Sequence, residues 1–301
     1  MIKNLIFLFC LIIIISSCKS DRNNDYKSEF IIPDSVLYEG VLEVSQEAMD
    51  EIIHNISSPV EMAALIKALG VPFSKEYLAT TDYVDDYNTS FKQAYNLGTF
   101  GADLGYLNMY NKTTAVIDYI SAIKKLADGI NVGQFFNFST LKRLATSSKN
   151  LDSLMYISIR SFNRMDSYLH ENNRSNLSAL IVAGVWVEGL YITTQVAKEN
   201  PHPDIAERIG EQKLILNNLL LILKNYKKDK KFASLIKILE ELKDEFADVK
   251  ITYIPGEPEA IEEDGMLTII QNETSMVEMT DKQLENIINK TEKIRNQLIR
   301  L

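Results

Sequence analysis

The chain has 301 residues, of which 46% are hydrophobic, and it carries a formal net charge of −9 at neutral pH. The length suffices for one large domain or two small ones. The acidic balance argues against a nucleic-acid partner, which requires a basic face, and against broad electrostatic adhesion to anionic lipid.

The first seventeen residues have the composition of a secretory signal peptide. Lys3 precedes an unbroken apolar run from Leu5 to Ile15. This run is too short to cross a bilayer, which takes about 20 apolar residues, but it suits the apolar part of a signal peptide. We expect residues 1–17 to be removed on export, which takes away Lys3 and leaves a charge near −10 (−9 − 1).

The tetrapeptide Ile15-Ser16-Ser17-Cys18 resembles a bacterial lipobox, which has an aliphatic residue, two small residues and a lipidated cysteine. The resemblance implies that Cys18 becomes the first residue of the mature chain and carries several acyl chains such as palmitate. Two or more acyl chains give stable membrane attachment. Lys19 is compatible, by the same resemblance, with sorting to the outer membrane, on its periplasmic or its surface face. An uncleaved membrane helix and an ordinary signal peptide cut elsewhere remain the alternatives.

The mature chain is expected to have neither a disulfide nor a free thiol. Its two cysteines are Cys10, which leaves with the apolar run, and Cys18, which the lipid caps. Cysteine-bound zinc, thioether-linked haem and thiol redox chemistry are thereby excluded. Residues 18–34 are polar and predict a flexible tether. Residues 35–301 contain no further low-complexity linker, so we expect a single helical domain there.

Apolar residues recur at helical spacing through most of this domain. The clearest start signal is Ser58-Pro59-Val60-Glu61, with a capping serine, a proline at the first helical position and the glutamate of a capping box. This helix is expected to end at Gly70. Further helices are predicted over residues 45–56, 85–110, 114–128 with Gly129 as the stop, 140–147, 151–171, 176–198, 204–226 and 231–248.

The pattern changes near the C-terminus. Residues 250–254 and 266–270 are short and rich in β-branched side chains, which predicts strands, and an acidic loop with proline and glycine separates them. We therefore predict a β-hairpin-like excursion over residues 250–275.

A second capping box, Thr280-Asp281-Lys282-Gln283, marks the start of a final helix over residues 281–301. The predicted fold class is all-α, a multi-helix bundle of about eight to nine helices with a small β element.

Two apolar helical segments, around residues 95–110 and 180–195, share an unusual composition. Each holds several small residues, two or more of them glycines, one acid and a tyrosine three positions after the acid, so that acid and tyrosine share a helix face. The pairs are Asp103 with Tyr106 and Glu188 with Tyr191. A glycine inside a helix costs about 1 kcal/mol relative to alanine, so several glycines indicate that two helices approach closely.

Glu188 is the only charge in the fourteen residues from Ala179 to Ile192, which predicts that it is buried. A buried carboxylate must be paired, hydrogen-bonded or protonated. One interpretation is a tight helix crossing in which a tyrosine hydroxyl, an arginine or a backbone amide satisfies each carboxylate. Another is a ligand pocket between the two segments. Its candidate lining residues are Asp103, Tyr106, Trp186, Glu188 and Tyr191.

The sequence gives only weak support for a metal site or a catalytic nucleophile. Residues 51–54 form a Glu-x-x-His of the kind that di-iron helical bundles use twice. The other match, residues 199–202, contains Pro201, which ends its helix. His170 near a helix end is explained by the helix dipole. Neither Gly-x-Ser-x-Gly nor a phosphate-binding glycine loop occurs, and we expect neither a metal nor another cofactor.

The mature chain loosely resembles the uncharacterised helical lipoproteins of Gram-negative envelopes, a resemblance that transfers no site residues. We expect a non-enzymatic, lipid-anchored module that binds or holds another envelope component, with that component and the membrane as its partners. The alternative is a lipoprotein that binds a small or apolar ligand in the pocket described above. A third hypothesis is a hydrolase that uses Asp103 and Glu188.

Overall fold

The structure is a computed structural model, and it describes residues 65–145, 151–254, 259–263, 266–270 and 274–300. All of them lie in a compact unit that spans Glu43–Leu301. The predictions for the signal peptide, Cys18, the tether and the helix over residues 45–56 lie outside the described residues. The same holds for the predicted start of the next helix at Ser58.

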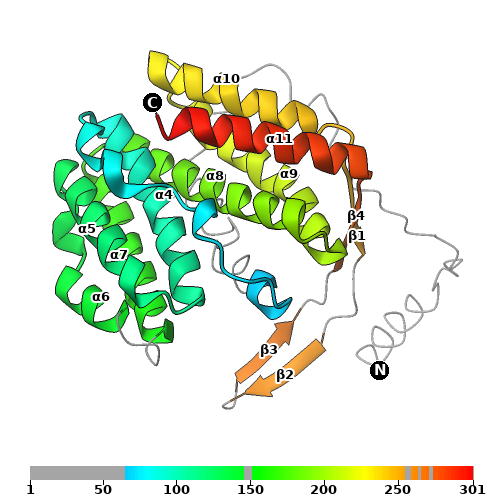
Figure 1. The fold of residues 1–301 in the computed structure, drawn as a ribbon, viewed down its shortest axis with the longest axis horizontal. Coiled ribbons are helices and arrows are strands. Elements are labelled where there is room, and N and C mark those ends of the chain that lie inside the picture. The colour runs from blue at the N-terminus through cyan, green and yellow to red at the C-terminus, as the bar shows by residue number, and fades with distance from the viewer. Residues whose placement is uncertain (1–64, 146–150, 255–258, 264–265, 271–273, 301) are drawn as a thin grey trace, which may run out of the picture. The chain divides into compact units, whose positions relative to one another are not determined.

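Eight α-helices form most of the described chain, and each corresponds to one predicted helix (Figure 1), so the all-α class is confirmed. They are α4 (Ser90–Met109), α5 (Thr113–Gly129), α6 (Phe138–Ala145), α7 (Leu151–Glu171), α8 (Ser175–Glu199), α9 (Pro203–Lys224), α10 (Lys230–Glu245) and α11 (Asp281–Leu298). Three short 3₁₀ helices accompany them: η2 (Lys75–Tyr77), η3 (Thr81–Asp86) and η4 (Gly133–Phe135).

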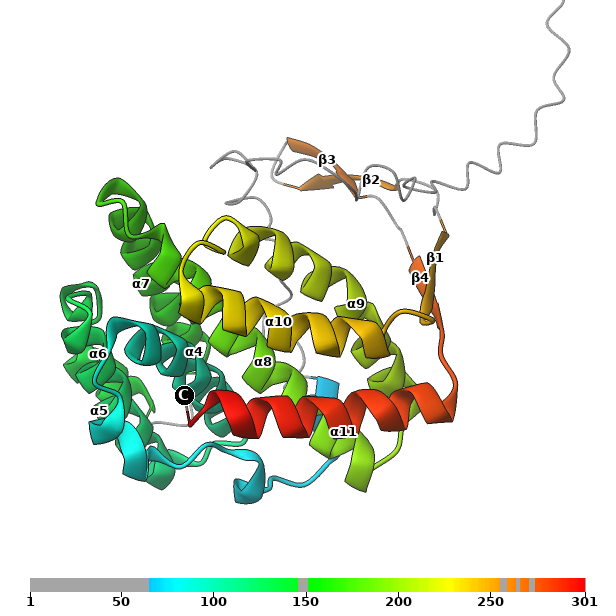
Figure 2. The ribbon, with the colours of Figure 1, turned by 90° about the horizontal axis from the view of Figure 1, so that it is seen from above.

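Helix α8 is the centre of the described bundle. It packs against α4, α7, α9 and α11, as Figures 1 and 2 show from two directions. Every residue from Leu177 to Ala197 is buried except Val185 and Gly189. A helix that is apolar on all sides must be enclosed by others. Within the described residues, α8 is the one helix long and apolar enough to cross a membrane, and 94% of that apolar window is buried in the fold.

The helix that precedes Val71 ends where the sequence predicts. Gly70 has a φ of +73°, its amide donates to the Lys67 carbonyl at 3.0 Å, and the Val71 amide donates to the Ile66 carbonyl at 3.3 Å. This left-handed glycine with paired backbone hydrogen bonds is the usual way to satisfy the last carbonyls of a helix.

The predicted start of one helix was wrong, and the predicted end of the next was confirmed. Helix α4 begins at Ser90 and not near residue 85, because residues 81–86 form η3 and the Thr89 hydroxyl caps α4 by accepting from the Lys92 amide. Helix α5 does end at Gly129, but the left-handed residue after it is Asn131, with a φ of +55°. Asparagine tolerates this conformation through its short polar side chain.

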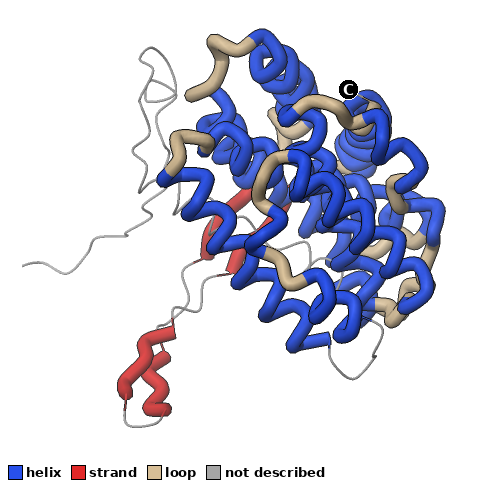
Figure 3. Tube along the Cα trace, turned by 90° about the vertical axis from the view of Figure 1, so that its left-hand side faces the viewer, coloured by secondary structure: helices blue, strands red, loops and turns tan. Residues whose placement is uncertain are grey.

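The strands form two antiparallel pairs, drawn in red in Figure 3. They are β1 (Lys250–Ile254), β2 (Glu259–Glu263), β3 (Met266–Ile270) and β4 (Thr274–Glu278). Both predicted strands, β1 and β3, exist. However, β1 pairs with β4, with Ile254 opposite Thr274, and β3 pairs with β2, with Ile270 opposite Glu259. The prediction of an acidic loop was therefore wrong over residues 259–263, which form β2. Three of these five residues are glutamates, which are uncommon in strands.

Candidate functional site

Helices α4 and α8 cross in direct backbone contact. A Cβ atom added to Gly98 would lie 2.0 Å from the Ile181 carbonyl oxygen, and one added to Gly184 would lie 2.0 Å from the Tyr95 carbonyl oxygen. No real side chain fits at such distances, so glycine is required at both positions. The close approach that the sequence predicts is confirmed, and Gly98 with Gly184 provides it.

The carboxylate of Glu188 is buried beside this crossing and is paired with Arg295 of α11. Arg295 Nη2 lies 2.6 Å from Glu188 Oε1, and Arg295 Nε lies 2.9 Å from Oε2. The two residues are 1% and 5% exposed. Burial alone would lower the pKa of Arg295, but the charge of Glu188 raises it above its ordinary value. The guanidinium also lies over the ring of Tyr191, at 4.3 Å from the ring centre.

Asp103 of α4 joins the same group from the other side of the crossing. It is fully buried, and its Oδ2 accepts from the Ala79 amide at 3.2 Å. Burial, followed by the charge of Glu188, raises the pKa of Asp103 well above its usual range, while Arg295 and the Ala79 amide oppose this shift. The raised pKa of Asp103 favours its protonated, neutral form.

We refer to Asp103, Glu188 and Arg295 as the acid–arginine cluster. One guanidinium charge faces two carboxyl groups, so the cluster is neutral when Asp103 holds its proton and Glu188 does not. Loss of that proton would leave an unbalanced negative charge in the interior, which is costly. Asp103 Oδ1 has no hydrogen-bond partner among the described residues. A buried oxygen without a partner costs less on a neutral carboxyl group than on a charged carboxylate.

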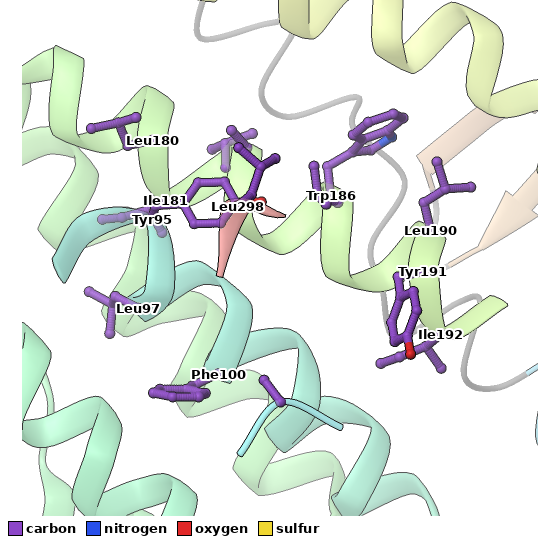
Figure 4. Packing of buried hydrophobic residues seen from close by; sticks show 14 of the residues in the cluster. Tyr95, Leu97, Phe100, Leu180, Ile181, Trp186, Leu190, Tyr191, Ile192 and Leu298 are labelled. Carbon is purple, nitrogen blue, oxygen red and sulfur yellow. The ribbon is translucent and has the colours of Figure 1, made fainter. Parts of the chain in front are cut away.

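The structure brings together three of the five residues proposed to line a pocket, namely Asp103, Glu188 and Tyr191. Tyr106 turns to another neighbour, since its hydroxyl accepts from the Ser74 amide at 3.2 Å. Trp186 lies on a different side of α8 from Tyr191 (Figure 4), and its Nε1 donates to Gln212 Oε1 on α9 at 3.0 Å. Each carboxyl group thus has one of the partners expected for a tight crossing, an arginine for Glu188 and a backbone amide for Asp103.

Hydrogen bonds with tyrosine and glutamate side chains of the bundle hold residues 71–80, a segment that includes η2 and that we name the strap. Tyr110 donates to the Val71 carbonyl at 2.7 Å, Tyr77 donates to Glu199 Oε2 at 2.5 Å, and Tyr119 donates to the Ala79 carbonyl at 2.5 Å. Both backbone polar groups of Ala79 are therefore hydrogen-bonded, the carbonyl to Tyr119 and the amide to Asp103. Sequence analysis did not identify the strap, since backbone groups bound by distant side chains leave no local pattern.

Arg295 was also missed. The described residues of α11 that are buried are Ile287, Ile288, Thr291, Ile294, Arg295 and Leu298, which form one stripe along the helix. Arg295 lies seven positions after Ile288 and four after Thr291, so it occupies a place where the helical period calls for an apolar side chain. The arginine on the apolar stripe of this helix was the sequence signal that could have predicted a buried acid as its partner.

His170 lies at the corner between α7 and α8. Its Nδ1 is 3.1 Å from the Ser175 hydroxyl, its Nε2 is 3.3 Å from Asp166 Oδ1, and the Ser178 hydroxyl also donates to Asp166. The first turn of α8 contains no acidic residue of its own. Asp166 places its charge there from α7, where it compensates the positive end of the helix dipole.

The predicted metal motifs gain no further ligands. No group of three or more His, Cys, Asp or Glu side chains that could hold a metal ion occurs in the part of the chain that the structure describes. His54 lies outside that part. The second Glu-x-x-His is divided as expected, since Glu199 accepts from Tyr77 and His202 caps α9 by accepting from the Asp204 amide at 3.2 Å.

The arrangement can hold three helices and the strap together. Asp103 and Glu188 do converge, but at 0% and 1% exposure neither can reach a substrate from solvent. Comparison of the chain with protein-family models, with curated proteins and with solved structures gave no match.

Proposed function

We propose that the chain is a lipid-anchored helical protein of the cell envelope, and that it binds or holds another envelope component. Its N-terminal eighteen residues support the anchor, through the short apolar run and the lipobox-like Ile15-Ser16-Ser17-Cys18. Lys19 supports the outer membrane as the location. The polar tether that follows, taken as a coil of about 15 residues, would separate the folded domain from the lipid by roughly 20 Å.

One observation carries the choice of a binding or holding module over an enzyme or a pocket protein. The two acids that the sequence singles out are enclosed at a crossing where the backbones of α4 and α8 touch. Their partners are Arg295 and the Ala79 amide, which are parts of the same chain. Such a site stiffens the domain, and a stiff body on a flexible tether suits a protein that positions a partner.

Replacement of Cys18 by alanine tests the anchor. Cells would be fed an alkyne analogue of palmitate, and the protein would be captured and examined for label and for membrane fractionation. Cys18→Ala should lose the label and leave the membrane fraction, because two or more acyl chains are what hold it there. Cys10→Ser is the matched control and should keep both. Unchanged labelling of Cys18→Ala would contradict the proposal.

The binding half of the proposal is tested by chemical cross-linking in intact cells at native expression level. The lipidated chain should form a discrete cross-linked species with an envelope protein, and Cys18→Ala should lose it because the domain no longer lies at the membrane. Native mass spectrometry of the purified chain provides the opposite outcome. A retained small molecule with no cross-linked protein would favour the ligand-binding alternative instead.

A further inference from the structure

We propose that the strap and the C-terminal helix α11 form a single latch, coupled through the acid–arginine cluster, so that release of either one loosens the other. The strap lies at the N-terminal end of the described chain and α11 at its C-terminal end. The inference concerns a conformational device inside the bundle, and it stands whether or not the protein is anchored by lipid.

On the strap side, the joint is Ala79. Its amide donates to Asp103 and its carbonyl accepts from Tyr119 of α5, and Ala79, Asp103 and Tyr119 are all buried. Burial raises the pKa of Tyr119, so its hydroxyl keeps the proton that it donates. Closure of the strap over Asp103 therefore excludes water from one face of the cluster.

On the helix side, the joint is Arg295, which donates two buried hydrogen bonds to Glu188. A second joint lies one turn further along, where the Tyr87 hydroxyl donates to the Ile299 carbonyl at 3.1 Å. Tyr87 follows η3 directly and is itself buried. The strap and the residues that follow it up to Tyr87 are thus connected to the C-terminal end of α11 at two places. One is the hydrogen bond from Tyr87 to Ile299, and the other is the acid–arginine cluster, to which Arg295 belongs.

Access of water to the cluster couples the joint at Ala79 to the joint at Arg295. When the strap opens, water reaches Asp103, the effective dielectric around Glu188 and Arg295 rises, and their attraction weakens. When α11 leaves, Glu188 loses its counter-charge and draws water into the same space, which competes with Asp103 for the Ala79 amide. Coupling of this kind is reciprocal, because each event changes the free energy of the other by the same amount.

Hydrogen–deuterium exchange of the full chain tests the coupling, with Tyr119→Phe as the variant and Tyr110→Phe as its matched control. Each change removes one tyrosine hydroxyl that donates to a backbone carbonyl of the strap, but only Tyr119 binds next to the cluster, at Ala79. Tyr119→Phe should speed amide exchange both in the strap and in α11, by about fivefold or more. Fivefold corresponds to the lower end of typical coupling free energies between two sites. Tyr110→Phe should speed it in the strap alone.

The reciprocal arm starts from α11, with Arg295→Lys as the variant and Lys198→Gln as its control. Lys198 pairs with Glu292 at 2.9 Å and also ties α11 to α8, but on the exposed surface and away from the cluster. Arg295→Lys should speed exchange at Ala79, whereas Lys198→Gln should not. Peptides from α6 serve as the internal reference for general unfolding.

Two results would overturn the latch. One is an α11 whose exchange is unchanged in Tyr119→Phe although the strap exchanges faster. The other is equal acceleration of α11 in Tyr119→Phe and Tyr110→Phe, which would reflect general loss of stability. If Arg295→Lys does not fold, the tyrosine pair still decides the question, because those variants keep the charges and the ring packing.

Discussion

Glu188 and Arg295, 107 residues apart in the chain, form a buried ion pair with two hydrogen bonds at 2.6 and 2.9 Å. The pair connects the central helix α8 to the last helix α11. It accounts for the single charge in the most apolar part of the sequence and for the arginine on the apolar stripe of α11.

Removal of one partner should therefore be costly. Glu188→Ala leaves Arg295 buried without a counter-charge, and we expect a loss of about 3–5 kcal/mol in the free energy of unfolding. Urea denaturation followed by far-UV circular dichroism measures it. Glu292→Gln, which removes the exposed pair with Lys198, is the control and should cost less than about 1 kcal/mol. Unchanged stability of Glu188→Ala together with loss of a bound ligand would favour the pocket hypothesis.

The helix crossing makes a second prediction about the glycines. Gly184→Ala places a methyl group 2.0 Å from the Tyr95 carbonyl oxygen, so α4 and α8 must move apart. Overpacking of this kind typically costs about 1–3 kcal/mol, and more where backbone must shift. Gly101→Ala is the control on α4, because nothing lies within 4 Å of its added methyl group. It should raise stability by about 1 kcal/mol through helix propensity. Equal melting temperatures for the two variants would refute the crossing.

How far the sequence predicts this structure depends on how local the signal is. All eight described helices were predicted, because apolar periodicity and the signals at helix ends act within a few residues. The capping box at Thr280 is present, with the Gln283 amide donating to the Thr280 hydroxyl and the Thr280 amide to the Gln283 side chain. Glycine and acid patterns also indicated the crossing and the burial of Glu188.

The misses share a different origin. Tyr87 continues the apolar period of α4 backwards from Phe91, so the predicted helix began near residue 85 and included the last two residues of η3. The partners of Asp103 and Glu188 lie on the strap and on α11, and no local pattern specifies which distant element closes over a buried acid. For that reason the sequence left open whether the two acids meet, a question that the packing of α4 against α8 decides.

The capping box supports a third prediction about α11. Thr280→Ala removes the hydroxyl that accepts from the Gln283 amide at 3.3 Å, and leaves the first turn without its side-chain acceptor. A loss of about 1 kcal/mol is expected from the free energy of unfolding. Thr252→Ala, at an exposed position of β1, is the comparison. A change in Thr280→Ala no larger than in Thr252→Ala would show that the cap does not stabilise α11.

The proton on Asp103 supports the last prediction, on pH. Its pKa in the folded chain lies above the value of about 3.9 expected when the chain is unfolded. Below about pH 4 both states hold the proton, and the stability that it contributes is fully present. As pH rises, the unfolded chain releases the proton first. The free energy of unfolding then falls, by up to about 1.4 kcal/mol per pH unit, until the folded pKa is reached.

Asp103→Asn should remove this dependence. The amide carbonyl can still accept from the Ala79 amide, so this contact of Asp103 is kept without a titrating group. Urea unfolding at a series of pH values should show the variant gaining stability over the wild type as pH rises from about 4. Asp118→Asn, at an exposed position of α5, should run parallel to the wild type. A constant difference between Asp103→Asn and the wild type would mean that Asp103 is ionised in the fold, because only a retained proton makes the difference grow with pH.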